Sequence, residues 1–468
     1  MKRITNTYFI LIFLFLFSCK KLVQIDPPVD SITTSQVFTD STDAASALAG
    51  MYSSIAYAGG LGFGNSVMTV YPGMSSDELL QFGSVNPLTT NSLSANNDAG
   101  TSSIWNFGYK LLYEPNAIIE GLQASTTLLP SVKNELFGEA YWFRAFINFY
   151  LVNLYGDIPL ITTINYKSNA LASKTPAAVV YDSIINDLKV AQDLLPPDYS
   201  AGGGERIRAN KWAAAALLAR VFLYRDSFAL AEAQATAVIN NPGLYSLDTS
   251  NGVFLADNPE AILQWQNNSS LNQNTYNATT EGDHIIPSDA TSQPNYYMTD
   301  QLLGAFENGD LRKTAWIDST IYSGVTYYYP YKYKVGPSQE HPNAPVTEYY
   351  TVLRLAEQYL IRAEARAQQS NLTGAISDLN VIRNRAGLGN LSASLPQTEV
   401  LAAVAQERRI ELFAEWGHRW FDLKRTNTVG TVFSTIPYKN QYQPFQQLYP
   451  IPLGELQFDP NLRQNPGY

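Results

Sequence analysis

The sequence is poor in cysteine and histidine. Its 468 residues include one cysteine, Cys19, and three histidines. A single thiol cannot form an intrachain disulfide, and it excludes a metal site built from several cysteines. The histidines, His284, His341 and His418, lie far apart in the sequence, so we do not expect a three-histidine metal site. These residues therefore predict no metal and no cofactor.

Charge is also scarce in this chain. Only 15% of the residues are charged, whereas soluble domains average roughly 25%. The 31 lysines and arginines are outnumbered by 41 aspartates and glutamates, which leaves a formal net charge of −10. Nucleic-acid binding depends on clustered lysine and arginine, so this balance argues against a nucleic-acid partner. In contrast, 45% of the residues are hydrophobic, including 30 tyrosines, 21 phenylalanines and 7 tryptophans, and the chain can bury a large core.

Motifs of several enzyme classes are missing. The sequence has no Walker A loop, no G-x-S-x-G nucleophile motif and no H-E-x-x-H zinc motif. Three carboxylates do lie four residues apart on one face of a predicted helix: Glu407, Glu411 and Glu415. A glycoside hydrolase needs two carboxyl groups on opposite sides of the scissile bond, which one helix face does not supply.

The same three carboxylates have cationic neighbours in the sequence. These neighbours lie in the same helix and the turn after it: Arg408, Arg409 and Arg419. Opposite charges at this spacing favour ion pairs. We therefore predict a structural ion-pair network, which we extend to Asp422 and Arg425, and no catalytic residue.

One apolar run stands at the N-terminus. It covers about ten residues, 8–17, whereas a membrane-spanning helix requires roughly 17 to 25. With Lys2 and Arg3 before it, the run is typical of a signal peptide. The next residues, Leu-Phe-Ser-Cys19, resemble the lipobox of bacterial lipoproteins, in which the cysteine is lipidated. We expect a signal peptide over 1–18 and a lipid anchor and tether over 19–37, although a secretory signal with an incidental cysteine is the alternative.

Helical periodicity dominates the rest of the chain. Apolar residues over 136–154 recur every three or four positions, and Gly156 and Pro159 follow as stop signals. The segments 211–226 and 229–240 form a further predicted helix pair. The sequence therefore predicts a mainly α-helical protein.

A second predicted helix has clear punctuation at both ends. It covers 180–195, with Thr175 as the N-cap and Pro176 in the first turn. Two prolines, Pro196 and Pro197, follow it and cannot continue a helix.

The helix pairs repeat along the chain. Residues 226–244 lie over residues 370–388 at a constant offset of 144. The matched positions are Phe228 with Leu372, Ala231 with Ala375, Val238 with Ile382, Asn240 with Asn384, Gly243 with Gly387 and Leu244 with Leu388. Small residues at fixed places in paired helices are typical of tetratricopeptide-like units, in which neighbouring helices approach closely. Two unrelated amphipathic helices are the alternative.

Two stretches differ from the helical remainder. Residues 57–101 and 247–350 are rich in Gly, Ser, Asn, Tyr and Pro. We interpret the second stretch as an irregular subdomain with short helices and strands, because a long structureless insertion is uncommon in a compact protein. Its tyrosine-rich run at 327–333 is predicted to be a strand, so that only alternate side chains can face a ligand.

The sequence as a whole resembles the SusD/RagB family of nutrient-binding outer-membrane lipoproteins. The resemblance covers nearly the whole chain. Its markers are Cys19 with the segment 25–28 (IDPP), 139–150 (EAYWFRAFINFY), 155–160 (YGDIPL), 354–365 (RLAEQYLIRAEA), 379–388 (LNVIRNRAGL), 407–412 (ERRIEL), 416–425 (WGHRWFDLKR), 449–452 (YPIP) and 461–468 (NLRQNPGY).

The resemblance implies a fold and a function. The fold would be a superhelix of tetratricopeptide-like helix pairs with an inserted irregular ligand-binding subdomain. The resemblance divides the chain into a helical region 38–246 with a variable loop segment 57–101, a ligand-binding subdomain 247–350, and a C-terminal helical region with a closing tail, 351–468. Members of the family form a lid on a SusC-like TonB-dependent outer-membrane transporter and deliver oligosaccharides or peptides to it, without catalysis of their own.

Candidate ligand-binding residues come from the two variable stretches. A sugar needs flat aromatic platforms beside amides and carboxylates that form paired hydrogen bonds. The candidate platforms are Tyr276, Tyr296, Tyr297 and Trp316, and the candidate hydrogen-bonding groups are Asp77, Asn96 and Asn97. Trp105 is assigned to the core instead, because its place before a predicted helix resembles a packing position of the family.

The predicted function is therefore the capture of oligosaccharides by a lipoprotein anchored at Cys19 to the outer membrane and facing the cell surface. A peptide ligand is the alternative within the family. A secreted glycoside hydrolase and a helical scaffold that binds only proteins are the alternatives from other classes.

Overall fold

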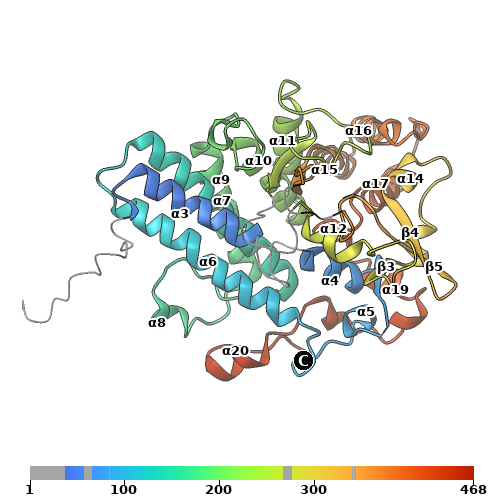
Figure 1. Cartoon of the computed structure of the whole chain (residues 1–468), viewed down its shortest axis with the longest axis horizontal. Coiled ribbons are helices and arrows are strands. Elements are labelled where there is room, and N and C mark those ends of the chain that lie inside the picture. The colour runs from blue at the N-terminus through green and yellow to red at the C-terminus, as the bar shows by residue number, and fades with distance from the viewer. Residues whose placement is uncertain (1–36, 57–65, 84, 267–276, 340, 342–343) are drawn as a thin grey trace, which may run out of the picture.

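The computed structural model describes residues 37–56, 66–83, 85–266, 277–339, 341 and 344–468. The predicted signal peptide, Cys19 and Tyr276 lie outside these ranges. Figure 1 shows a helical molecule in which the strands β3, β4 and β5 lie together at one end. The prediction of a mainly α-helical fold is confirmed.

The helices before the first long strand make up the N-terminal half. They are α3 (Ser41–Ala56), α4 (Val67–Ser75), α5 (Pro87–Thr90), α6 (Thr101–Ala124), α7 (Pro130–Tyr155), α8 (Tyr166–Asn169), α9 (Ala177–Leu194), η2 (Ser200–Gly202), α10 (Lys211–Tyr224) and α11 (Phe228–Ile239). The remaining helices are α12 (Thr280–Ile285), α13 (Asp300–Leu303), α14 (Leu311–Ala315), α15 (Leu355–Gln368), α16 (Leu372–Arg385), α17 (Gln397–Glu411), α18 (His418–Arg425), α19 (Val429–Phe433), η3 (Pro437–Lys439), η4 (Pro444–Gln447) and α20 (Leu453–Phe458).

The described strands form three antiparallel pairs. The strands are β1 (Leu79–Gln81), β2 (Ala261–Trp265), β3 (Tyr296–Met298), β4 (Ile317–Tyr322), β5 (Val325–Pro330) and β6 (Tyr350–Arg354). β1 pairs with β3, β2 with β6, and β4 with β5. The tyrosine-rich run forms a strand only as far as Pro330, and along it Tyr328 is exposed and Tyr329 is buried.

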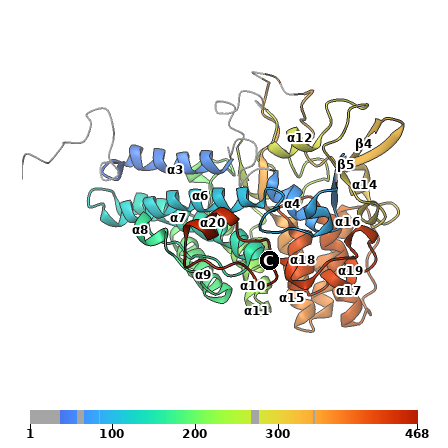
Figure 2. The same ribbon diagram turned by 90° about the horizontal axis from the view of Figure 1, so that it is seen from below.

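The long helices stack in sequence order. α6 packs on α7, α7 on α9, α9 on α10, α10 on α11, α11 on α15, and α15 on both α16 and α17. Figure 2 shows α12, β4 and β5 on one side of the C-terminal helices α15 and α17. The irregular elements therefore lie on a helical superhelix, as the resemblance implies.

Alanine explains the close packing of α10. Its N-terminus is capped by Asn210, whose side chain accepts hydrogen bonds from the N–H groups of Trp212 and Ala213. All residues of the segment 213–223 are buried, and several of them are alanine. Alanine favours the helix and lets the helices on either side approach closely.

The repeat is confirmed by the helix bounds. α10 spans Lys211–Tyr224 and α15 spans Leu355–Gln368, so both bounds differ by 144 residues. The turn that follows each helix contains a residue with left-handed backbone conformation: Asp226 with φ of 52° and Ser370 with φ of 64°. These two residues also differ by 144 positions, so the helices and the turn repeat together.

The predicted N-cap of α9 is wrong by one residue. The helix begins at Ala177, with Pro176 as its N-cap residue. The first N–H group, that of Ala177, donates to the Asp157 carboxylate at 2.8 Å. Thr175 instead forms two backbone hydrogen bonds with Ile158, at 2.8 and 3.2 Å. The cap comes from a residue outside the helix segment, which local sequence signals do not include.

Regular elements lie within one predicted loop segment and across one predicted limit. The stretch 57–101, predicted as a variable loop segment, contains α4, and all nine residues of this helix are buried. The limit predicted between residues 350 and 351 falls inside β6, which pairs with β2. The irregular stretch is thus joined to the C-terminal region by a shared sheet.

A buried ion-pair network lies among the C-terminal helices. Glu411 of α17 accepts hydrogen bonds from three arginines of other elements: Arg312, Arg354 and Arg385. Glu407 pairs with Arg312 at 2.5 Å, and Glu415 pairs with Arg354 at 2.8 Å and also with Lys332. The predicted structural role of the three carboxylates is confirmed.

The predicted partners of these carboxylates are wrong. Arg408 pairs with Asp422 at 2.7 Å, while Arg409 and Arg419 both pair with Asp77. A pair within one exposed helix stabilises it by only about 0.2–0.5 kcal/mol, whereas a buried guanidinium needs acceptors for several N–H groups. Packing against other elements therefore selects the partners. Arg425 pairs with Asp422 as predicted.

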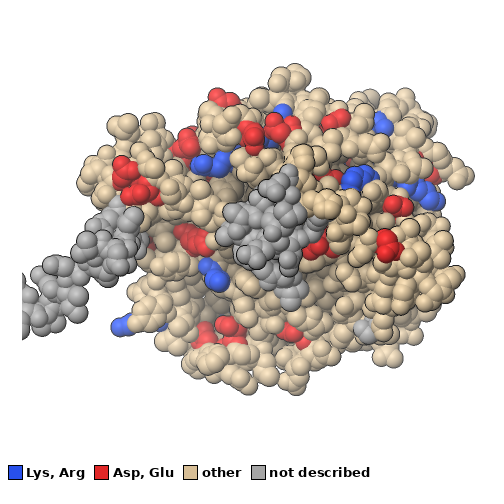
Figure 3. Space-filling view, viewed as in Figure 1, with Lys and Arg blue, Asp and Glu red and all other residues tan. Residues whose placement is uncertain are grey.

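The outside of the molecule is correspondingly low in charge. On the face shown in Figure 3, lysine, arginine, aspartate and glutamate are scattered among neutral side chains. Within the described part of the chain, no helix has both the length and the apolar character that crossing a membrane requires.

Candidate functional site

Two of the predicted ligand-binding residues, Trp316 and Asp77, belong to the core, so their predicted role is wrong. The Trp316 side chain has no exposed surface, and its indole N–H donates to the Ser250 carbonyl at 2.5 Å. The Lys332 ammonium lies 4.6 Å from its ring centroid. Trp316 therefore offers no free ring face to a ligand. Its burial depends on distant contacts that the composition of a variable stretch does not reveal.

Asp77 is the second corrected residue. It is 1% exposed, and its carboxylate binds Arg419 through both oxygens, at 2.7 and 3.0 Å, and Arg409 at 2.7 Å. Burial alone would raise the pKa of this carboxyl, but the two guanidinium groups hold the pKa below its ordinary value. Asp77 is therefore a structural anion that joins the start of β1 to α17 and α18. Trp105, assigned to the core, is 2% exposed, which confirms that prediction.

The two variable stretches meet at the pairing of β1 with β3. Leu80 is paired with Tyr297 and Gln81 with Tyr296. Successive strand residues point to opposite faces, so the two tyrosines lie on opposite sides of this short sheet. The structure thus unites segments that are more than 200 residues apart.

Four half-buried rings gather on the Tyr297 side, and we call them the aromatic surface. Its members are Phe82, Tyr297, Tyr322 and Tyr327. Tyr327 lies edge-on to Tyr297 with ring centroids 5.0 Å apart, and edge-on to Phe82 at 5.4 Å. Phe82 also lies edge-on to Tyr322 at 5.6 Å. Edge-to-face contacts fix the rings relative to one another while parts of them remain accessible.

A pair of amide side chains lies on the opposite face of this sheet, because Gln81 is paired with Tyr296. The amide of Asn86 donates to the side-chain carbonyl of Gln81 at 2.6 Å, and its own carbonyl caps α5. On the aromatic surface itself, the tyrosine hydroxyl groups can form hydrogen bonds with a ligand. Burial, with smaller contributions from Tyr327 and Asp300, raises the pKa of the Tyr297 hydroxyl. The hydroxyl group therefore stays protonated at neutral pH and can donate a hydrogen bond.

Tyr296 points away from the aromatic surface. Its neighbour is Tyr71, whose pKa is raised to about 12 by burial and by the proximity of Tyr296 and Asp98. The turn just before Asp98 holds Asn96 and Asn97, which are both exposed. Asn97 forms two backbone hydrogen bonds with Ser94, both at 3.1 Å. These residues remain candidate ligand contacts, and Tyr296 lies on the face of β3 opposite Tyr297.

Sequence reasoning missed Phe82, Tyr322 and the importance of Tyr327. Tyr322 and Tyr327 lie on the same face of the hairpin, because Tyr327 is paired with Thr320 and residues two apart share a face. The alternation in the tyrosine-rich run was the available signal for Tyr327. Phe82 had no such signal, because its ring contacts come from β3 and the hairpin.

This arrangement suits recognition rather than reaction. Partly exposed rings can stack on the C–H faces of a sugar, and the tyrosine hydroxyl groups can bind its hydroxyl groups. Within the described ranges, no group of three or more His, Cys, Asp or Glu side chains could hold a metal ion.

Comparison with known protein families gives matches in both halves of the chain. The model of the SusD family matches residues 265–468. A second model, described as starch-binding and associating with the outer membrane, matches residues 31–223. The two matches together leave only the N-terminal segment and residues 224–264 uncovered.

Individual proteins show the same likeness. A SusD-like protein of Formosa agariphila is 29% identical over 517 aligned positions, which cover 100% of both chains. The structure of a SusD superfamily protein from Bacteroides vulgatus has a TM-score of 0.80 at 22% identity and covers 92% of this chain and 100% of that one. A laminarin-binding SusD-like protein has a TM-score of 0.74 at 25% identity and covers 91% of this chain and 99% of that one. The chain therefore belongs to the SusD/RagB family.

Proposed function

We propose that this protein captures oligosaccharides at the aromatic surface and delivers them, without catalysis, to a SusC-like TonB-dependent transporter in the outer membrane. One observation carries the proposal: the β1–β3 pair brings aromatic side chains from both variable stretches onto one accessible face. The laminarin-binding relative and the starch-binding family description support a carbohydrate ligand.

Tyr297 and Tyr327 are the proposed platforms. Each keeps part of its ring accessible, and their mutual contact at 5.0 Å holds both rings in place before a ligand arrives. A binding site that is already ordered loses less conformational entropy when the ligand binds. Asn96, Asn97 and Tyr296 are proposed as additional contacts on the neighbouring side of β3.

Location and partner form the second part of the proposal. Cys19 would carry the acyl chains, at roughly 0.8 kcal/mol per buried methylene group, and several chains on one residue would anchor the protein durably. The family description names association with the outer membrane, which supports this location. The transporter is proposed as the partner that receives the ligand at the cell surface.

A peptide ligand is the second candidate within the same function. Aromatic rings also accept peptide side chains, and the exposed Asn96 and Asn97 could bind backbone amides. A glycoside hydrolase is less well supported, because the predicted carboxylate stripe is occupied by arginines and a lysine in the interior.

The ligand test uses the soluble chain from residue 20 onward, with calorimetric titration of starch and laminarin oligosaccharides and of mixed peptides. We expect saturable binding of an oligosaccharide without release of reducing ends. Tyr327→Ala should weaken this binding about tenfold, because it removes one platform and loosens another. The matched control is Tyr328→Ala, since Tyr328 is 44% exposed and lies on the opposite face of the same strand.

Three results would contradict parts of the proposal. Binding of peptides alone would replace the ligand class, and release of reducing sugar would make the protein an enzyme. Equal binding by both tyrosine variants would reject the aromatic surface as the site.

Anchoring and partnership need a separate experiment with the full chain in cells. Cys19→Ala should move the protein from the membrane fraction to the soluble fraction. Affinity purification of the unmodified protein should recover a TonB-dependent transporter. Continued membrane attachment of the variant would exclude Cys19 as the anchor, and purification without any transporter would exclude the proposed partner.

A further inference from the structure

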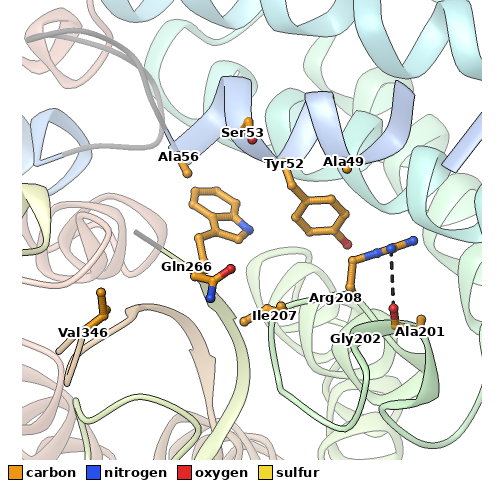
Figure 4. A pocket seen from close by; sticks show the side chains of 11 residues that line it. Ala49, Tyr52, Ser53, Ala56, Ala201, Gly202, Ile207, Arg208, Gln266 and Val346 are labelled. Carbon is orange, nitrogen blue, oxygen red and sulfur yellow. Dashed lines mark hydrogen bonds between the residues drawn. The ribbon is translucent and has the colours of Figure 1, made fainter. Parts of the chain in front are cut away.

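A second cavity lies away from the aromatic surface, at the end of α3. It has a volume of 610 Å³, within the range of roughly 300–1,000 Å³ that is usual for ligand pockets. Figure 4 shows α3 along one side, the segment around Arg208 on another and Gln266 beside Ile207. The remaining lining residues are Ala49, Tyr52, Ser53, Ala56, Ala201, Gly202, Trp265 and Val346. It shares no residue with the aromatic surface.

One wall of this cavity is fixed by a buried hydrogen-bond network. The hydroxyl of Tyr52 donates to the Glu139 carboxylate at 2.5 Å and accepts from the N–H group of Ala209 at 2.8 Å. Arg208 binds the same carboxylate with two N–H groups, at 2.5 and 2.7 Å. Glu139 itself has no exposed surface. The ring of Tyr52 is therefore held rigidly at the cavity, which is how a platform for a sugar should be held.

Hydrogen-bonding groups of the cavity are left for a ligand. The third guanidinium nitrogen of Arg208 has only a long contact of 3.5 Å, to the Ala201 carbonyl. Gln266 is exposed and donates to the Tyr349 hydroxyl at 2.9 Å, while its side-chain carbonyl accepts no hydrogen bond from any other described residue. An unused donor or acceptor of this kind is more typical of a ligand site than of a packed core.

The electrostatics of the cavity select among ligands. Arg208 is the one charged residue among the described residues that line the cavity, and two carboxylates lie beside it: Glu139 in direct contact and Glu135 at 3.8 Å. The positive charge is thus already neutralised from the protein side. A uronate or sulfated sugar would meet no free cation here, whereas hydroxyl groups could bind the amide and the guanidinium edge.

We infer that this cavity is a second carbohydrate subsite, which takes neutral, hydroxyl-rich sugar units. The inference rests on the proposed function, since it supplies a further point of attachment for the same class of ligand. Two subsites on one chain would raise the overall affinity for a glycan that reaches both, relative to a short fragment.

The test is calorimetric titration of the soluble chain with maltohexaose and laminarihexaose, and with trigalacturonate as an anionic probe. We expect a neutral hexaose to bind at two sites per chain. Ala49→Trp should remove one of them, because Ala49 is exposed and a large side chain there fills the cavity without disturbing the core. Ala45→Trp is the matched control, since it lies one turn earlier on the exposed side of α3 and outside the cavity.

A second, milder variant keeps the test valid if Ala49→Trp does not fold. Gln266→Ala removes one neutral hydrogen bond, so affinity at the cavity should fall about threefold to tenfold. Tyr327→Ala should weaken the other site and leave the cavity unchanged.

The outcomes separate the inference from the proposed function. One binding event that Tyr327→Ala weakens and both cavity variants leave unchanged would overturn the inference and leave the proposed function standing. Tighter binding of trigalacturonate than of both hexaoses at the cavity would overturn its assignment to neutral sugars. Failure of all three probes to bind the unmodified protein would contradict the proposed function and the inference together.

Discussion

The two repeated helix pairs have the same geometry and different interiors. Leu218 of α10 corresponds to Arg362 of α15, 144 residues later, and both are buried. Arg362 binds Asp378 of α16 through two hydrogen bonds, at 2.7 and 3.0 Å. The residue that corresponds to Asp378 in the first pair is Gln234 of α11. A buried leucine of one unit is therefore replaced by an ion-paired arginine in the other.

This difference shows that helix bounds and core chemistry are specified separately. Turn residues and helical periodicity set the bounds, which agree between the units except that α16 ends two residues later than α11. The interior only has to be filled and satisfied, either by apolar packing or by charges that pair completely. The C-terminal half combines an apolar cluster with the second solution, and Glu411 lies at the centre of its charged part.

The strongest test of the comparison removes the central carboxylate. Glu411→Ala leaves Arg312, Arg354 and Arg385 short of an acceptor in the interior. Loss of one member of a buried ion pair costs about 3–5 kcal/mol, so we expect a decrease of about 4 kcal/mol in the free energy of unfolding. Urea denaturation measures it. The control Glu399→Ala, on the exposed side of α17, should change stability by less than about 0.5 kcal/mol. Equal effects of Glu411→Ala and Glu399→Ala on the free energy of unfolding would mean that the ion-pair network contributes nothing to stability.

Truncation of the apolar counterpart, Leu218, should lower the free energy of unfolding somewhat less. Leu218→Ala opens a cavity in α10, where the side chain has no exposed surface. Buried leucine-to-alanine changes cost about 2–5 kcal/mol, and we expect about 3 kcal/mol because α9, α11 and α15 pack around this helix. The same urea series measures it, with Leu230→Ala as control, since Leu230 is 51% exposed. A cost below about 1 kcal/mol would mean that the neighbouring helices close the space.

A double-mutant cycle sharpens the comparison between the two units. Arg362→Leu alone introduces the residue of the first unit and leaves Asp378 with Arg366 as its partner, at 2.9 Å. We expect a loss of about 2 kcal/mol in the free energy of unfolding. Arg362→Leu with Asp378→Gln should cost only about 1 kcal/mol, because the second change removes the incompletely paired carboxylate. Additive effects of the two changes would show that the ion pair is not the relevant difference.

The smallest expected change from one measured condition to the next concerns a buried carboxyl group that has no ion-pair partner among the described residues. Burial, and then the charge of Asp77, raise the pKa of Glu78 to about 8 from its ordinary 4.5. The stabilising protonated form is fully present below about pH 4.5, and its contribution is lost as the pH rises to about 8. Stability should therefore fall over this window by at most about 1.4 kcal/mol per pH unit.

Glu78→Gln imitates the protonated form, so it should flatten this part of the pH profile. Thermal unfolding at half-unit steps of pH measures both proteins, with Glu399→Gln as the control. An unchanged slope in Glu78→Gln would show that the carboxyl group stays ionised in the fold.

Much of the fold could be predicted from local signals. The helix over 136–154, the α10–α11 pair and the repeat at an offset of 144 all follow from spacing, caps and breakers. The structural role of Glu407, Glu411 and Glu415 was predictable as well. A single helix face cannot place two carboxyl groups on opposite sides of a scissile bond, as a glycoside hydrolase requires. The start of α9 was misplaced because its cap is Asp157, a residue outside the helix segment.

The candidate site was only partly predictable. Tyr297 lies on the aromatic surface, whereas Trp316 and Asp77 are buried in the core. All three come from variable stretches of similar composition, so the sequence carried no signal that separates them. Burial is decided by contacts with residues such as Ser250 and Arg419, which lie far from them in the chain.

The sequence by itself determined the helices, their pairing into repeated units and the family, because these depend on residues within a few turns of one another and on contiguous motifs. Only the tertiary structure decided which arginines neutralise Glu411, which aromatic rings remain accessible, and that β1 pairs with β3. Each of these depends on long-range contacts, in which packing and the need to satisfy buried charge outweigh any local preference.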